Sequence, residues 1–342
     1  MLKINIPGKL YLIGEYNVLH DGKSAILFTL DRYIKASITK SEHFVFVNEK
    51  QVYPFEYKEG QIRVEDDSLK ISESALQVAF NYLGFLNIKL KPFCLTLTNE
   101  LVSKDGIKFG LGSSAAILIA ILKSVLLFHE VEFNLLELFK IAVLGQYLIG
   151  NKTSGGDLAA CTYGGVVFYT RYDYKWLKDN LLQGFKLIKQ EWPLLEIESL
   201  PYTNLMLKVG WTNSAHTTDA NLASVLHRED VFLKFTEKAN VAVLEAKEAI
   251  IKQDYDKLGA MMSRYQALLY KLDFDLNLGF NSEILNTLIK IANEHHGYSK
   301  ISGAGYGDCG ISLCASPKLD SAWKKAGIIP LKYKIANPLK ED

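Results

Sequence analysis

Two glycines and two serines stand directly before a long apolar run in the stretch FGLGSSAAILIAILKSVLLF, which begins at Phe109. Residues 113–128 are small or long and apolar and contain no proline, which predicts a helix that begins at the two serines. The backbone N–H groups at such a helix start are free, and the positive end of the helix dipole points outward. Gly110 and Gly112 lack Cβ atoms, so a bulky anion can approach these amides closely.

The stretch therefore fits a phosphate-binding loop, but it equally fits a plain helix cap in front of a core helix. It is not a Walker A loop, because no Gly-Lys-Ser/Thr follows the glycines.

Two charged residues lie close to glycines elsewhere in the chain. Lys9 follows a predicted turn at Pro7-Gly8 in PGKLYLIGEY, and a second turn is predicted at Gly14. Asp157 follows two glycines in TSGGDLAACTYGG and precedes a short helix of small residues. A lysine at a strand start is ordinarily solvated, and an aspartate after Gly-Gly is a good helix N-terminal residue. Neither residue alone indicates a site.

A fourth glycine-dense stretch, SGAGYGDCG, spans residues 302–310. We predict a turn between a helix and a strand here. This density of glycine suits close approach of the backbone to a ligand, and it also suits a tight connection with no ligand.

The composition bounds the class of protein. The chain has 342 residues, 49% of them hydrophobic, which is enough for two domains with their own cores. Its 39 Lys and Arg balance 38 Asp and Glu, which argues against nucleic acid or an anionic membrane as partner. The four cysteines form no CxxC pair, and no signal peptide or bilayer-spanning run is evident, so we expect a cytoplasmic protein.

The elements that must position these residues follow an α+β pattern. We place an N-terminal domain at residues 1–190 and a C-terminal domain at 191–342, with a crossover in the polar and aromatic stretch 173–201. Strands are predicted in 23–38, 91–101, 204–212, 309–315 and 328–335. Helices are predicted in 72–85, 134–149, 231–253 and 282–296.

Taken together and in this order, PGKLYLIGEY, GLGSSAA and SGAGYGDCG resemble the three motifs of the GHMP kinases. The resemblance spans almost the whole chain. Within the family, GKLYLIGEY, KFGLGSSAA, GWTNSAHTT and SGAGYGDCGI are most similar to the phosphomevalonate kinases of bacteria, and GDCG is the most discriminating piece. The resemblance implies a two-domain α+β fold, with an N-terminal α/β domain like that of ribosomal protein S5 and a ferredoxin-like C-terminal α+β domain.

The resemblance also implies roles for individual residues. Lys9 and Asp157 match the catalytic lysine and aspartate of the family, and the hydroxyl of Ser114 would lie near Mg²⁺. The residues expected to hold the phosphates of ATP are Lys108, Gly110, Leu111, Gly112, Ser113, Ser114 and Ala115. Those expected to bind substrate are Lys9, Tyr16, Ser214, His216, Thr217, Thr218, Gly303, Ala304 and Gly305, with Gly307 also in the floor beneath the phosphates.

Two positions depart from the family pattern. In mevalonate kinases a glutamate about eleven positions before the catalytic aspartate helps to hold Mg²⁺, and that count back from Asp157 reaches Gln146. Tyr306 stands where phosphomevalonate kinases commonly carry glycine. Its ring is expected either to cap the nucleotide or to point to solvent.

The function implied is transfer of the γ-phosphoryl group of ATP to 5-phosphomevalonate, a small-molecule substrate, by a monomer or homodimer. The alternatives are a mevalonate kinase, whose acceptor is an alcohol, and a non-catalytic ligand sensor of the same fold. Retention of Lys9, Ser114 and Asp157 together argues against the sensor.

Overall fold

Two β-sheets organise the computed structural model, which describes residues 1–63, 66, 69–103, 105–203, 205–213, 228–306 and 308–336. The seven-stranded sheet has the order β4-β3-β7-β2-β8-β9, with β1 paired to β2, and only the β3–β7 pairing is parallel. Its strands are β1 (Leu2–Ile13), β2 (Ser24–Lys40), β3 (Val45–Asn48), β4 (Gln51–Pro54), β7 (Phe93–Asn99), β8 (Val166–Thr170) and β9 (Glu196–Leu200). A separate hairpin joins β5 (Glu56–Lys58) and β6 (Gln61–Arg63).

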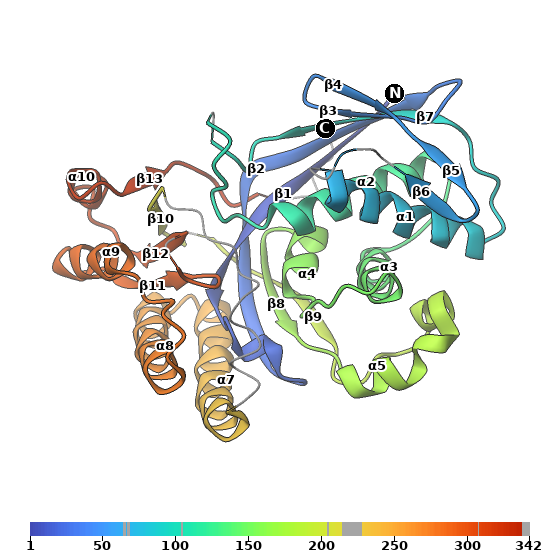
Figure 1. The fold of residues 1–342 in the computed structure, drawn as a ribbon. Helices are drawn as coiled ribbons and strands as arrows, with labels where there is room; N and C mark the ends of the chain where they lie inside the picture. Colours follow the sequence, from blue (N-terminus) through green and yellow to red (C-terminus); the bar gives the residue numbers. More distant parts are fainter. Residues whose placement is uncertain are drawn as a thin grey trace.

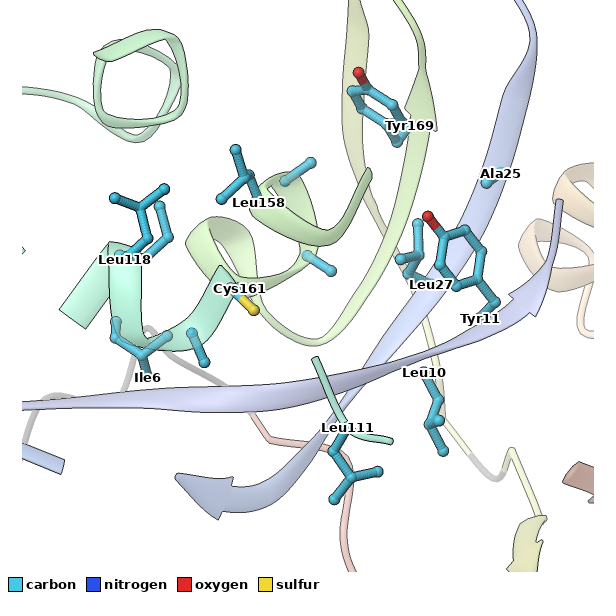
Figure 2. Close-up of a cluster of buried hydrophobic side chains, with 14 of the residues drawn as sticks. Ile6, Leu10, Tyr11, Ala25, Leu27, Leu111, Leu118, Leu158, Cys161 and Tyr169 are labelled. Atoms are coloured by element: carbon cyan, nitrogen blue, oxygen red, sulfur yellow. The ribbon is translucent and has the colours of Figure 1, made fainter. Parts of the chain in front are cut away.

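Four helices cover this sheet in two tiers (Figure 1). Helices α2 (Ser113–Phe128) and α4 (Gly156–Tyr163) pack on β1 and β2, while α1 (Lys70–Phe85) and α3 (Leu135–Leu148) pack on those helices. The apolar character of α2 on all sides follows from this position, because both of its faces are covered. Figure 2 shows part of the resulting core, to which Leu118 of α2, Leu158 of α4, Ile6 of β1 and Leu27 of β2 all belong. Helix α2 begins and ends at the predicted residues.

A four-stranded antiparallel sheet, in the order β11-β12-β10-β13, forms the second domain with its helices. The strands are β10 (Leu207–Trp211), β11 (Tyr298–Ser302), β12 (Cys309–Leu313) and β13 (Ile329–Leu331). The helices are α7 (Glu229–Ile251), α8 (Tyr255–Leu276), α9 (Glu283–Glu294) and α10 (Leu319–Lys325). Helix α8 packs on β11, α9 packs on β11 and β12, and α7 also reaches β2 of the larger sheet (Figure 1). The arrangement confirms the predicted α+β class.

Three local predictions are wrong. Pro7-Gly8 is no turn but a register shift inside the continuous strand β1, a position that tolerates proline because a ladder hydrogen bond is interrupted there. SGAGYGDCG joins two antiparallel strands, β11 and β12, and not a helix and a strand. The expected crossover at 173–201 folds instead as α5 (Tyr174–Asn180), the 3₁₀ segment η3 (Leu181–Lys189) and β9.

Because β9 pairs with β8, the chain leaves the larger sheet only after Leu200. It returns at the other end, where Ile335 bridges Leu30 and the backbone N–H of Ala336 donates to Thr29 O over 3.1 Å. The chain therefore passes between the two domains more than once. The boundary at residues 190 and 191 stays a prediction.

Candidate active site

Lys9 and Asp157 meet at the surface between β1 and the start of α4. The Nζ atom of Lys9 lies 2.9 Å from Oδ2 of Asp157. Lys9 is not the solvated strand-start residue that its local sequence suggested, because only 7% of its side chain is exposed, whereas 39% of the Asp157 side chain is exposed. The ammonium group is therefore held on one side by protein and faces a partner that solvent and ligands can reach.

Residues 109–112, here called the 109–112 loop, lie directly against Lys9. The backbone N–H of Lys9 donates to Leu111 O over 2.9 Å. Gly112 has φ of 72°, and a Cβ atom there would come within 2.4 Å of Lys9 Cε. Gly110 has φ of 76°, and its Cβ would come within 2.7 Å of Asp308 Cβ. Both glycines are needed for their backbone conformation and for the space that a side chain would take from Lys9 and Asp308.

Helix α2 starts at this point with Gly112 as its N-cap, and no side chain among the described residues caps it. The first intrahelical bond runs from the Ala116 N–H to Gly112 O, so the amides of Ser113, Ser114 and Ala115 precede the helical ladder. Ser114 is exposed, and Ser113 and Ala115 are partly exposed. An uncapped and accessible helix start is a good site for a phosphate group.

Asp157 lies in the first turn of α4, which begins after Gly155 in the left-handed conformation with φ of 88°. Tyr169 of β8 holds the start of this turn, because its hydroxyl donates to Ser154 O over 2.6 Å. Burial raises the pKa of Tyr11 well above its ordinary value, and the charge of Asp157 and a hydrogen bond to it add to this effect. Tyr11 therefore stays a neutral phenol beside Asp157.

The C-terminal domain contributes the turn between β11 and β12. Ser302 Oγ donates to Tyr11 O over 2.8 Å, and Tyr16 Oη donates to Ala304 O over 2.6 Å. On the other flank, Cys309 Sγ donates to Phe109 O over 3.1 Å. The turn is thus fastened to β1 and to the 109–112 loop, so the three sequence motifs converge on one place.

Sequence reasoning missed two contacts at this place. Glu15, inside the quoted motif PGKLYLIGEY, forms a fully buried ion pair with Lys300 of β11. The available signal was a lysine inside the otherwise apolar and small strand YSKIS. Asp308 was also missed, although its side chain lies against Gly110 and its carbonyl accepts from the Thr212 N–H over 3.1 Å.

For the other predicted site residues the structure gives less support. Ser214, His216, Thr217, Thr218 and Gly307 lie outside the described residues. Lys108 is exposed and forms an isolated bridge with Val102. The hydroxyl of Tyr16 is already engaged by the C-terminal domain, and its ring stacks on Phe280 at 4.8 Å. Contact of Tyr16 or Lys108 with a ligand stays a prediction.

The structure describes both residues that depart from the family pattern. The side chain of Tyr306 does not extend freely into solvent, because its hydroxyl donates to Leu278 O over 3.2 Å and its ring meets Phe280 edge-on. Capping of the nucleotide by this ring stays a prediction. Gln146 lies at the end of α3, where its side-chain oxygen accepts from Asn151 Nδ2 over 3.2 Å.

The side chains here fit a magnesium ion only modestly. In the described part of the chain, no three His, Cys, Asp or Glu side chains cluster as a metal site. Oxygen groups in this region include the hydroxyl of Ser114, which is exposed at the start of α2, and the carboxylates of Asp157 and Asp308. Mg²⁺ commonly keeps few protein ligands and takes the others from phosphates and water, so this donor set is compatible with it.

None of the described helices is long and apolar enough to cross a bilayer.

Comparisons with known proteins extend this description. Residues 72–165 match the GHMP kinases N terminal domain and residues 246–327 match the GHMP kinases C terminal family. The phosphomevalonate kinase of Streptomyces sp. (strain CL190) is 32% identical, with 95% of this chain and 94% of that protein covered. The mevalonate kinase of Thermococcus sibiricus is 25% identical, with 96% and 95% covered.

Solved structures agree on the fold. The Lin0012 protein from Listeria innocua superposes with a TM-score of 0.92 at 28% identity and 98% coverage of both chains. Streptococcus pneumoniae phosphomevalonate kinase, in complex with phosphomevalonate and AMPPNP, superposes with a TM-score of 0.85 at 22% identity, with 98% of this chain and 100% of that chain covered. Full-length similarity, two matched domains and the convergence of three glycine-rich motifs on Lys9 lead to one assignment: this chain belongs to the GHMP kinase family.

Proposed function

We propose that this protein is an ATP-dependent phosphomevalonate kinase, which transfers the γ-phosphoryl group of ATP to 5-phosphomevalonate and releases 5-diphosphomevalonate and ADP. The observation that carries the proposal is the position of Lys9, whose stem crosses Gly112 at the start of α2 and whose ammonium pairs with Asp157. The choice of acceptor is supported by the full-length relative at 32% identity, because the mevalonate kinases compared are 23–26% identical.

In this proposal the amides of Ser113, Ser114 and Ala115 and the dipole of α2 hold the phosphates of ATP. Mg²⁺, bound with ATP near Ser114, supplies neutralisation of phosphate charge. Glycine at 110 and 112 lets the side chains of Asp308 and Lys9 lie directly against the 109–112 loop, since a Cβ atom at either position would collide with them.

Lys9 neutralises charge on the transferred group. Two phosphate anions repel by about 1 kcal/mol per unit pair at ~4 Å even in water, and by more in a drier site. A chain with 39 cationic and 38 anionic residues must concentrate cations locally to offset this. Lys9 is preorganised by its contacts with Asp157 and the 109–112 loop, and Lys108 is positioned in sequence to assist.

Asp157 acts by placing Lys9 and not by removing a proton. A phosphomonoester has a second pKa near 6, so the attacking phosphate oxygen is already largely ionised at pH 7. An alcohol acceptor would need a general base instead. The 2.9 Å contact to Lys9 supports the placing role.

The remaining assignments rest on the same proposal. Ser214, His216, Thr217 and Thr218 bind the substrate, and residues 303–305 form the floor beneath the phosphates. The N-terminal domain, residues 1–190, holds the nucleotide, and residues 191–342 form the substrate-side domain. The four cysteines are free, which supports a cytoplasmic enzyme, as monomer or homodimer.

A coupled assay of ADP release with phosphomevalonate, with mevalonate and with neither tests the proposal. We expect a specificity constant for phosphomevalonate far above that for mevalonate, because cations arranged for a second phosphate lack their partner when the acceptor is an alcohol. Equal or better use of mevalonate would leave only the kinase family standing. Nucleotide binding without turnover of either acceptor would favour a sensor.

A further inference from the structure

Near the end of β1 lies another ion pair, and this one connects the two domains. Glu15 and Lys300 pair directly, and 2% of the Glu15 side chain and 0% of the Lys300 side chain are exposed. The Lys300 ammonium also donates to Ile301 O, while Oε1 of Glu15 accepts from the Gly303 N–H over 3.3 Å. The pair therefore attaches to the backbone of the C-terminal domain on both sides of Ser302, immediately before the glycine turn.

Other contacts fasten the same two segments together. Tyr265 of α8 donates its hydroxyl hydrogen to Glu15 O over 2.6 Å. Tyr16 has φ of 61°, an unusual value for a bulky residue, and is held there by its bond to Ala304 O and its stacking on Phe280. A strained residue held by contacts from another domain indicates that the relative position of these segments is tightly specified.

Fold stability alone is a poor explanation for this pair. Removing two charges from water is unfavourable, and replacing a buried ion pair by apolar residues of similar volume is often neutral or stabilising. Burial lowers the pKa of Lys300, and the nearby charge of Glu15 only opposes this effect. Within the described part of the chain, Oε2 of Glu15 is buried and has no hydrogen-bond partner. A pair selected for stability would satisfy that oxygen.

We propose that Glu15 and Lys300 are a positioning pair, which sets the backbone of residues 303–305 relative to Lys9. Lys9 and Glu15 belong to one rigid segment, β1 and the turn that follows it, so a bond from Glu15 to Gly303 fixes the distance between the glycine turn and the catalytic ammonium. The catalytic part of this inference rests on the proposed kinase function. The structural part, a tether by which the pair holds residues 303–305 next to β1, does not rest on that function.

The test uses the full chain and three variants. Glu15→Gln removes the charge with an almost isosteric side chain. The double variant Glu15→Met/Lys300→Met removes both charges and the acceptor for Gly303 while keeping the volume apolar, so no unpaired charge stays buried. The matched control is Lys247→Met, which breaks ion pairs of 2.9 and 2.6 Å from α7 to Glu196 and Glu198 of β9.

Three quantities are measured for each variant: the free energy of unfolding in urea, amide hydrogen exchange in the peptide covering residues 298–313, and kcat with KM for both substrates. We expect the double variant to unfold near the wild-type urea midpoint, to exchange at least tenfold faster in 298–313, and to lose at least tenfold in kcat with less than threefold change in KM for ATP. Glu15→Gln should move in the same direction by at least threefold. Lys247→Met should keep wild-type exchange in 298–313 and wild-type kcat.

Wild-type exchange and kcat in the double variant would overturn the proposal. It would also be overturned if Lys247→Met and the double variant lost kcat and exchange protection to the same extent, each in proportion to its loss of unfolding free energy. If the double variant does not fold, Glu15→Gln decides, and wild-type exchange and kcat in that variant would overturn it. The exchange measurement needs no turnover. An inactive wild-type enzyme would therefore refute the proposed function while the tether was still being tested.

Discussion

One strand and the turn after it carry two ion pairs of opposite character. Lys9 pairs with Asp157, whose side chain is 39% exposed, and both partners belong to the N-terminal domain. Glu15 pairs with Lys300 across the domain boundary, and that pair is sealed from solvent. The open pair can exchange a partner for a ligand, whereas the sealed pair can only hold protein against protein. In the proposed enzyme, the charges near the start of α2 act on the substrate, and the charges at the end of β1 hold the two domains in position.

The difference predicts how the pairs respond to mutation. An exposed or half-exposed pair contributes little to stability, on the order of 0–1 kcal/mol. Breaking a sealed pair on one side costs about 3–5 kcal/mol, because an uncompensated charge stays buried. Changes at Lys9 should therefore appear in rates, and single changes at Lys300 should appear in stability as well.

The largest effect on rate is expected for Lys9→Met. Loss of one preorganised cation aimed at developing charge should lower kcat by about 10²–10³-fold. Methionine fills much of the same volume, so the unfolding free energy and the ATP dissociation constant, measured by calorimetry, should change little. A loss of ATP affinity as large as the loss of kcat would contradict a contact used mainly in the transition state.

Gly112→Val tests the 109–112 loop. Its Cβ would collide with the stem of Lys9 at 2.4 Å, so ATP affinity should fall at least tenfold while the fold survives. Gly106→Val is the matched control, because Gly106 has a similar φ of 79° and nothing within 4 Å of its Cβ position. Both variants carry the backbone strain of about 1–2 kcal/mol, and only the first fills the site. Unchanged ATP binding in Gly112→Val would remove the loop from the site.

Asp157→Asn separates placement from proton transfer. We expect kcat to fall about tenfold, and raising the pH should not restore it, because the substrate phosphate already supplies the nucleophile. The wild-type rate should rise with pH through the substrate's second ionisation near 6. A wild-type profile governed by an enzyme carboxylate would instead make Asp157 a general base.

The smallest effect is expected for a substitution of His129. This residue extends the comparison to a buried titratable group far from the proposed active site. Its Nε2 accepts from the Lys91 N–H over 3.0 Å, so Nδ1 carries the proton and donates to Val125 O over 2.8 Å. Burial lowers the pKa of His129 below 6.5. The unfolded chain then binds the proton first as pH falls, so stability is full above about pH 6.5 and decreases below it.

In His129→Phe this contribution should be absent, so the unfolding free energy measured in urea should change less between pH 7 and pH 5 than it does in the wild type. The kcat at pH 7 should stay near the wild-type value. If the unfolding free energy of His129→Phe depended on pH as in the wild type, another group would be the cause of that dependence.

Local sequence was sufficient for features whose causes are local. The bounds of α2 follow from Gly112, whose positive φ ends the preceding loop, and from an unbroken apolar run. The start of α4 at Gly155 and Asp157 follows in the same way. The turn assigned to Pro7-Gly8 failed because a bulge in a long strand depends on the partner strand, here Tyr33 and Leu30 of β2.

The sequence by itself determined which residues could bind phosphate, because glycine conformation, helix dipoles and the charges of Lys9 and Asp157 are properties of short segments. Only the tertiary structure decided that Lys9 is buried over Gly112 and that Glu15 meets Lys300, residues nearly a chain length apart. A charge has no preferred partner until folding removes water from around it. Its role, as a reactive group or as a fastening between domains, is therefore set by burial, which the local sequence does not encode.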